Sequence, residues 1–325
     1  MGAGVGGQAP LQGEYPVSAQ PREAGMAMER TLGVVAPILT PFNDDSSVAT
    51  DLYVAHAKWL FDQGCVGIAP FGTTGEALSV GIDERIAAIQ ALIDGGIDPA
   101  LMIPGTGLSN VADTARLSRA CLDMGCAAVM TLPPFYFKAV SEDGLYSYFE
   151  NLIDAVGSDA RIFLYHIPPI AVVGIPPSLA ERLHAKFPEQ IVGIKDSSGD
   201  WENTRALLEI EGLIVYPGSE LPLLDALQLG APGCITATAN INAAAVTNVI
   251  DHYSRGDIDA ARDLHEPVKT FRLKIQDFAP IPAQKRLLAI STGDARWANV
   301  RPPLTAMSEE FGCELATALK QEFDY

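Results

Sequence analysis

A lysine that follows a short apolar stretch is the feature of this sequence with the clearest chemical potential. In the segment Val192–Gly199, β-branched residues precede Lys195, and two serines and a glycine follow it, which predicts a buried strand running into a turn. Burial disfavours the charged ammonium and favours the neutral amine, a nucleophile toward carbonyl carbons. The alternative is a lysine whose stem packs against apolar neighbours while its ammonium reaches water.

Hydroxyl groups follow other apolar stretches. The segment Gly72–Glu76 supplies Thr73 and Thr74, Tyr136 follows residues 127–132, and Tyr165 ends a further apolar stretch. A tyrosine beside a second hydroxyl can relay protons, and a turn with free N–H groups can hold a small carboxylate. Together with a neutral lysine, these residues predict an imine to a 2-oxo acid, which then gains or loses an aldehyde at C3.

Composition and charge exclude several other classes of protein. The chain has 325 residues, 48% of them hydrophobic, and a net charge of −18, which would repel a nucleic-acid backbone. No apolar run reaches the length of a membrane span. The five cysteines form no CxxC pair, and no histidine or carboxylate cluster suggests a metal site. We therefore expect a cytoplasmic enzyme with no metal, no cofactor, and no nucleic-acid or membrane partner.

Apolar strands and amphipathic helical patterns alternate along most of the chain. Such alternation favours a parallel sheet with helices outside it, and eight units in this length indicate a (β/α)8 barrel. An open doubly wound sheet would usually carry a glycine-rich turn after its first strand, which is lacking here. The expected strands cover residues 33–39, 67–71, 101–104, 127–132, 161–165, 192–195, 214–216 and 233–237.

The predicted organisation has three parts. Residues 1–30, rich in Gly, Ala, Pro and Gln, are expected to be a flexible tail, and residues 31–256 are expected to form the catalytic barrel. Residues 257–325 show three further helical patterns and are expected to form a C-terminal helical extension packed on the barrel. In barrels of this kind the site lies at the carboxyl ends of the strands, where the lysine, tyrosines and threonines are expected.

Three of these motifs give a family resemblance from about Leu32 to the C-terminus. The segments Gly72–Glu76, Tyr165–Pro168 and Gly193–Asp196 resemble the dihydrodipicolinate synthase/N-acetylneuraminate lyase family of class I pyruvate-dependent aldolases. The resemblance implies that Lys195 forms the Schiff base, so that no other cofactor is needed. It further implies that Tyr165 is the catalytic acid/base.

The resemblance also assigns the neighbouring residues. It implies that Thr73 relays protons, that Thr74 and Gly72 hold the pyruvate carboxylate, and that Tyr136 enters a neighbouring subunit's relay across a dimer interface. Family members are usually tetramers, so a homodimer or homotetramer is expected. The remaining positions implied to line the substrate pocket are Gly218 and Ile235.

Two residues depart from the family pattern. His166 stands where asparagine is most common, and it either contacts the substrate or fixes the following loop. Ile170 stands at the substrate rim, where dihydrodipicolinate synthases have an arginine that binds the carboxylate of aspartate semialdehyde. Without a guanidinium that aldehyde loses a charge-assisted partner. The departure disfavours 4-hydroxy-tetrahydrodipicolinate synthase activity and favours an aldehyde derived from a 2-oxo-3-deoxy sugar acid or a hydroxy-oxo acid.

Three functions therefore stay open. The leading hypothesis is a lyase that makes or breaks a C–C bond between pyruvate and an aldehyde. The second is a dehydratase of a 2-oxo-3-deoxy sugar acid that uses the same lysine imine. The third is a non-catalytic barrel that binds a 2-oxo acid. Release of pyruvate would indicate the first, loss of water with the carbon skeleton intact the second, and absence of turnover the third.

Overall fold

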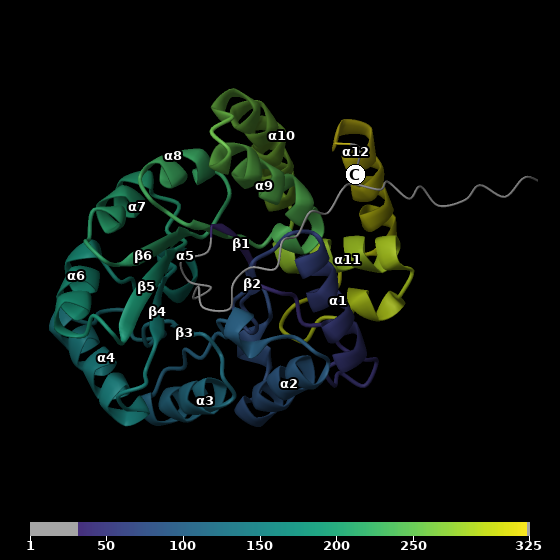
Figure 1. The fold of residues 1–325 in the computed structure, drawn as a ribbon. Helices are drawn as coiled ribbons and strands as arrows, with labels where there is room; N and C mark the ends of the chain where they lie inside the picture. The colour runs from purple at the N-terminus through teal and green to yellow at the C-terminus, as the bar shows by residue number, and fades with distance from the viewer. Residues whose placement is uncertain (1–31, 324–325) are drawn as a thin grey trace, which may run out of the picture.

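The computed structural model describes residues 32–323, so the tail expected over residues 1–30 lies outside the described part. Parallel strands form two arcs, ordered β2-β1-β7 and β3-β4-β5-β6, and helices surround them as a ring (Figure 1). The strands are β1 Gly33–Ala36, β2 Gly67–Ile68, β3 Val129–Thr131, β4 Ile162–His166, β5 Ile191–Asp196, β6 Ile214–Pro217 and β7 Gly233–Ile235. The expected (β/α)8 barrel class is confirmed by solved structures of similar fold, described below.

The third expected strand, residues 101–104, is not a regular strand. A 3-10 turn, Pro99–Leu101, occupies its start, and only isolated parallel bridges follow, from Met102 to Ile68 and from Gly105 to Met130. Pro104 has no N–H to donate to a ladder, which limits regular pairing here. These bridges join the two arcs on that side, and the lysine strand is therefore β5 rather than the sixth.

The outer helices bury their apolar faces against the strands. Asn110, Ser141 and Asp200 cap three of them by accepting a hydrogen bond from a backbone N–H. A further short helix, α5 Pro168–Ala171, follows β4, where only a loop was expected. The outer helices are α1 Thr50–Asp62, α2 Ile82–Asp94, α3 Val111–Asp123, α4 Glu142–Val156, α6 Pro177–Lys186, α7 Trp201–Leu208, α8 Leu223–Gln228 and α9 Ala239–Ser254.

The C-terminal helices pack against the barrel through a separate apolar cluster. They are α10 Ile258–Gln276, α11 Pro280–Thr292 and α12 Glu309–Phe323. Leu39 from the end of the first strand segment packs in this cluster with Phe271, Leu287 and Trp297. Burial of such side chains contributes about 1.5–3 kcal/mol each. None of the helices between residues 32 and 323 has the length and apolar character to span a membrane.

Candidate active site

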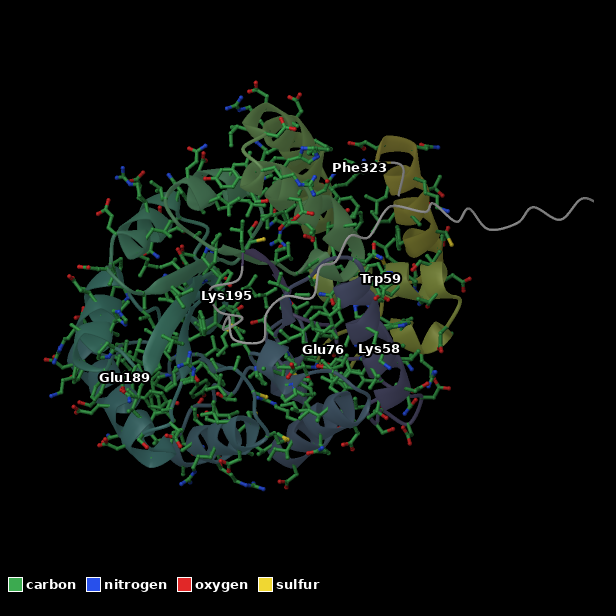
Figure 2. The ribbon with its side chains drawn as sticks, in the orientation of Figure 1. Lys58, Trp59, Glu76, Glu189, Lys195 and Phe323 are labelled. Carbon is green, nitrogen blue, oxygen red and sulfur yellow. The ribbon has the colours of Figure 1, made fainter. Side chains whose placement is uncertain are left out.

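Strand register brings the lysine and a tyrosine together. Lys195 on β5 pairs in register with Tyr165 on β4, so both side chains leave the sheet at the same level. The Lys195 Nζ donates a hydrogen bond of 3.3 Å to the Tyr165 hydroxyl, and only 4% of Lys195 is exposed. Figure 2 shows Lys195 near the centre of the ring of helices. The structure therefore does not support the alternative in which the Lys195 ammonium reaches water.

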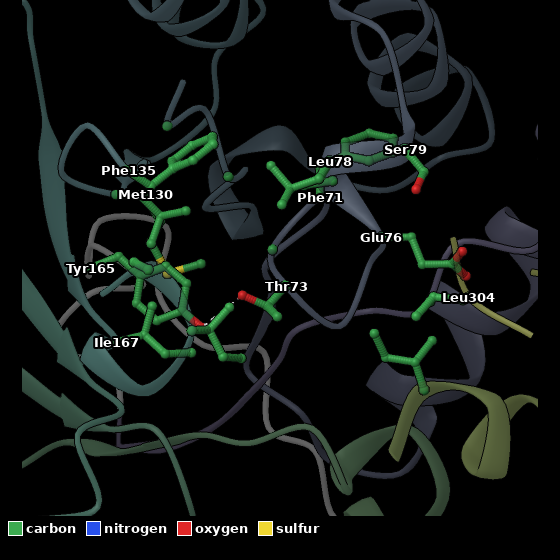
Figure 3. Close-up of a pocket in the computed structure, with 18 of the residues that line it drawn as sticks. Phe71, Thr73, Glu76, Leu78, Ser79, Met130, Phe135, Tyr165, Ile167 and Leu304 are labelled. Atoms are coloured by element: carbon green, nitrogen blue, oxygen red, sulfur yellow. Dashed lines mark hydrogen bonds between the residues drawn. The ribbon is translucent and has the colours of Figure 1, made fainter. Parts of the chain in front are cut away.

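A threonine extends this pair into a chain of polar groups. The Thr73 Oγ1 lies 3.3 Å from the Tyr165 Oη, within hydrogen-bond distance (Figure 3). The order amine, phenol and hydroxyl allows a proton to pass from the reacting centre toward Thr73. Sequence motifs separated by more than a hundred residues thus meet in one cluster.

The loop that carries Thr73 and Thr74 is held in an unusual backbone conformation. The residues at its two ends, Phe71 and Glu76, have φ values of 57° and 54°, in the left-handed region. Non-glycine residues in that region cost of order 1–3 kcal/mol and persist only where surrounding contacts hold them. A Cβ on Gly75 would lie 3.0 Å from the Ile38 carbonyl oxygen, so this position favours glycine.

Buried charges hold this loop in place. Arg85 donates to the carbonyl oxygens of Ala77 and, at 3.0 Å, of Val80. Glu76 forms a fully buried ion pair with Lys285 of α11, and its second oxygen accepts from the Arg301 N–H at 3.0 Å. Burial lowers the pKa of Lys285 to about 8, and the Glu76 carboxylate opposes that shift. The C-terminal helices therefore support the loop of residues 72–76 directly.

Close backbone packing explains one of the predicted binding positions, Gly218. A Cβ on Gly218 would lie 1.9 Å from the Ser197 Oγ, and the Gly218 N–H donates to the Asp196 carbonyl oxygen at 2.6 Å. Thr74 is buried and lines the same cavity as Lys195 and Gly218. The site therefore has a hydroxyl and a narrow backbone wall next to the amine.

Asp196 is a residue that the sequence reasoning missed. Its buried carboxylate accepts hydrogen bonds from the Ser198 N–H at 2.9 Å, from Asn203 at 3.0 Å and from Thr204 at 2.6 Å. These contacts fix the chain immediately after Lys195. The sequence signal for Asp196 is its position directly after Lys195 and directly before two serines.

Two cavities meet at Thr73 and Tyr165. The larger, of about 780 Å³, contains Lys195 and extends to α10 and α11. The smaller, of about 220 Å³ and lined mostly by apolar side chains, includes Gly72 and Phe135 (Figure 3). Thr73 and Tyr165 line both cavities, so a molecule bound to Lys195 could extend in either direction.

His166 fixes a loop and lines neither cavity. Its Nδ1 accepts a hydrogen bond of 2.7 Å from the Ile175 N–H, which requires that nitrogen to be unprotonated. Burial lowers the pKa of His166, although the Asp196 carboxylate acts in the opposite direction. Of the two roles considered for His166, the geometry supports contact with the following loop and not contact with the substrate.

The structure places Ile170 at the cavity rim, Ile235 in the barrel core and Tyr136 at the surface. Ile170, on α5, is 59% exposed and lines both cavities, so the rim at this point is apolar. Ile235 is fully buried among barrel-core side chains and lines neither cavity, which differs from its expected place in the pocket wall. Tyr136 is 88% exposed, with φ of 84°, and lines neither cavity within its own chain.

The site offers an amine and several hydroxyls for chemistry. Within the described residues, no three histidine, cysteine, aspartate or glutamate side chains gather as metal ligands would. A buried lysine next to a tyrosine at the carboxyl ends of barrel strands is suited to imine formation with a carbonyl compound. Fold and site together define a class I, pyruvate-dependent aldolase or lyase.

Comparison with known proteins gives the family. The profile of the Dihydrodipicolinate synthetase family matches residues 30–322, and the chain belongs to this family of lyases. An uncharacterized DapA-like lyase from Chloroflexus aurantiacus is 34% identical over 304 residues, covering 90% of this chain and 98% of that protein.

Solved structures agree with this assignment. Dihydrodipicolinate synthase from Agrobacterium tumefaciens has a TM-score of 0.80 and 34% identity, covering 90% of this chain and all of that one. YagE, a prophage protein of the same family from E. coli K12, was solved in complex with pyruvate. It has a TM-score of 0.81 and 26% identity, covering 89% of this chain and 98% of that one.

Proposed function

We propose that this protein makes or breaks a C–C bond between pyruvate and an aldehyde through an imine on Lys195. The chain of hydrogen-bonding groups Lys195, Tyr165 and Thr73 carries the proposal, because it joins a nucleophile to a proton relay. The pyruvate complex of YagE supports the choice of 2-oxo acid. The enzyme would act in the cytoplasm as a homodimer or homotetramer, with no cofactor beyond the covalent imine.

The reaction balances without an added oxidant or reductant. The Lys195 amine adds to C2 of pyruvate, and the carbinolamine oxygen leaves as water after Tyr165 donates a proton. The Tyr165 phenoxide then takes a proton from C3, which gives an enamine. C3 of the enamine bonds to the aldehyde carbon while Tyr165 gives that proton to the aldehyde oxygen. Water then hydrolyses the iminium, which releases a 4-hydroxy-2-oxo acid and restores the amine. Cleavage is the reverse sequence.

The remaining residues serve binding and proton transfer in this proposal. Thr74 and the Gly72 N–H hold the pyruvate carboxylate, and Gly218 keeps the backbone wall close to it. Thr73 passes protons onward to Tyr136, which a neighbouring subunit supplies. The 88% exposure of Tyr136 in one chain supports that arrangement, since the side chain is available for contact with another copy.

Aspartate semialdehyde is a disfavoured partner aldehyde. Relatives named 4-hydroxy-tetrahydrodipicolinate synthase, such as the 29% identical protein from Methanothrix thermoacetophila, make it the alternative to consider. Ile170, however, presents an aliphatic side chain at the rim that the two cavities share. A carboxylate there gains no charged partner of the kind that an arginine at this position would supply.

Borohydride trapping tests the proposal. Reduction in the presence of pyruvate should leave a stable adduct on the peptide that contains Lys195, detected by mass spectrometry. Lys195→Ala should give no adduct, whereas Lys186→Ala, at an exposed lysine on α6, should react like the wild type. A folded wild-type protein without an adduct, or with one on another lysine, would contradict the proposal. Product analysis then separates an aldolase, which releases pyruvate, from a dehydratase.

A further inference from the structure

Part of the C-terminal extension borders the site directly. Residues 299–304, which we call the C-terminal strap, follow the 3-10 turn Ala295–Ala298 and run to the smaller cavity. Pro303 and Leu304 of the strap line that cavity together with Thr73 (Figure 3). A residue that holds the strap in place can therefore affect the groups that surround the reacting centre.

Arg301 of the strap holds three other segments of the chain through its guanidinium group. Its Nη1 donates to the Ser79 carbonyl oxygen at 2.8 Å and to the Glu84 carboxylate of α2 at 2.7 Å. Its Nε donates to the Ser46 carbonyl oxygen at 3.0 Å, in the loop after β1, and its Nη2 donates to Ser46 and Glu84 as well. The guanidinium carbon also lies 4.4 Å from the centre of the Phe42 ring. The planar fork of arginine serves several acceptors in fixed directions, which the single ammonium of lysine does not.

Ser79 belongs to the same folded stretch of backbone as the threonines of the site. The Glu76 N–H donates to the Thr73 carbonyl oxygen at 3.2 Å, and the Ser79 N–H donates to the Glu76 carbonyl oxygen at 2.9 Å. Residues 72–79 are therefore a series of successive tight turns, and Figure 3 labels these three members of it. Arg301 holds one end of the series, and Thr73 lies near the other.

The strap also holds the middle of these turns. The Arg301 N–H donates to the Glu76 Oε2 at 3.0 Å, and Glu76 has the left-handed φ of 54° that only surrounding contacts maintain. One residue thus fixes the turns at two points. The Thr73 Oγ1 lies 3.3 Å from the Tyr165 hydroxyl, so a small shift of the turns breaks this contact. A misplacement of about 1 Å can cost an enzyme about 100-fold in rate.

We infer that Arg301 is a positioning residue for the proposed reaction, which fixes residues 72–79 so that Thr73 and Thr74 keep their places beside the imine. Arg301 lines neither cavity, so it acts through the turns and not on the substrate. The inference rests on the proposed imine chemistry. It makes pyruvate binding depend on a residue of the C-terminal strap.

Trapping kinetics test this role. Pyruvate is varied in the presence of cyanoborohydride, and formation of the reduced adduct on Lys195 is followed by intact mass. Arg301→Lys keeps a positive charge near Glu84 but cannot donate to the same set of acceptors. The pyruvate concentration that gives the half-maximal rate should therefore rise about 10- to 100-fold. Amide hydrogen exchange in a peptide that spans residues 72–80 should become about tenfold faster, while exchange in α11 stays unchanged.

Arg296 provides the matched control. It also joins the C-terminal extension to the barrel, through an ion pair of 2.8 Å with Asp51 and a hydrogen bond of 3.2 Å to Asn43. Among the described residues, however, it makes no hydrogen bond with the turns of residues 72–79. Arg296→Lys should therefore leave the half-saturating pyruvate concentration within about twofold of the wild type.

A second variant approaches the same contact from α2. Glu84→Gln removes the charge that orients the Arg301 guanidinium and leaves the arginine in place. It should raise the half-saturating pyruvate concentration in the same direction as Arg301→Lys, by about three- to tenfold. This variant decides the matter if Arg301→Lys does not fold, and an unchanged value in it would then overturn the inference.

The outcomes separate this inference from the proposed function. Unchanged trapping kinetics in Arg301→Lys, or an equal loss in Arg296→Lys, would overturn the inference and leave the imine chemistry intact. Slower trapping without faster exchange in residues 72–80 would also overturn it, because Arg301 would then act by another route. A wild type that traps no pyruvate would overturn the proposed function and this inference together.

Discussion

Two loops at the same end of the barrel differ in how they are held. The loop after β2, residues 72–76, is enclosed by its own chain, and its Thr73 reaches Tyr165 at 3.3 Å. The loop after β3, residues 132–138, ends in exposed aromatic side chains, with Tyr136 and Phe137 directed to solvent rather than into the site. Both loops carry residues that the family resemblance assigns to one proton relay.

The difference indicates that the two loops serve different steps of the proposed reaction. The groups that are proposed to form the imine are assembled within one chain, and a buried ion pair from the C-terminal helices supports their loop. The group that would complete the relay has no place in its own chain's cavity. We therefore expect the first loop to determine whether the imine forms, and the second to determine how fast protons move once another copy is present.

Removing the buried cation should have the largest effect. Lys285→Met leaves the Glu76 carboxylate buried without its ion pair, and breaking a buried pair in this way costs about 3–5 kcal/mol. The free energy of unfolding, measured by urea denaturation, should fall by that amount, and imine trapping at Lys195 should be lost with the loop geometry.

A surface ion pair provides the control for this variant. Lys274 pairs with Glu322 on the surface, where both side chains are partly exposed. Lys274→Met should therefore cost less than about 1 kcal/mol. Equal losses of stability for Lys285→Met and Lys274→Met would mean that the Glu76 pair does not support the first loop.

The tyrosine of the second loop should affect turnover and not stability. Tyr136→Phe should lower kcat about 10- to 100-fold, since it removes a proton-transfer group, while the urea midpoint stays unchanged. Tyr146→Phe on α4 is the matched control and should retain full activity. Mixing Tyr136→Phe with Lys195→Ala should restore up to about a quarter of wild-type activity, because hybrid dimers contain one complete site. Mixing without recovery would argue against a tyrosine shared between subunits.

The smallest effect is expected at the loop after β4, which His166 holds. Burial lowers the pKa of His166 in the folded protein, so the unfolded chain binds more protons below about pH 6.5 and stability falls as pH decreases. His166→Asn removes this contribution, so the free energy of unfolding should fall less between pH 7 and pH 5 in the variant than in the wild type. His56 and His265 also have lowered pKa values and provide the background in both proteins. Identical pH profiles for the variant and the wild type would contradict this role.

The sequence predicts those parts of the site that follow from strand periodicity. Lys195 and Tyr165 end neighbouring apolar strands, and parallel pairing brings such residues to one level. Strand periodicity predicts neither the interruption of the strand at Pro104 nor the short helix that carries Ile170. It also cannot pair Glu76 with Lys285, because Lys285 belongs to a helix beyond the barrel and reaches the loop only through tertiary packing.

The ion pair between Glu76 and Lys285 also has a consequence for protein synthesis. Its two residues are separated by 209 positions, so the carboxylate leaves the ribosome long before its partner is made. At typical rates of translation the interval is about 10–40 s. During that time the nascent barrel cannot enclose Glu76 without leaving a charge unpaired. The loop of residues 72–76 therefore reaches its final packing only when nearly the whole chain has been made.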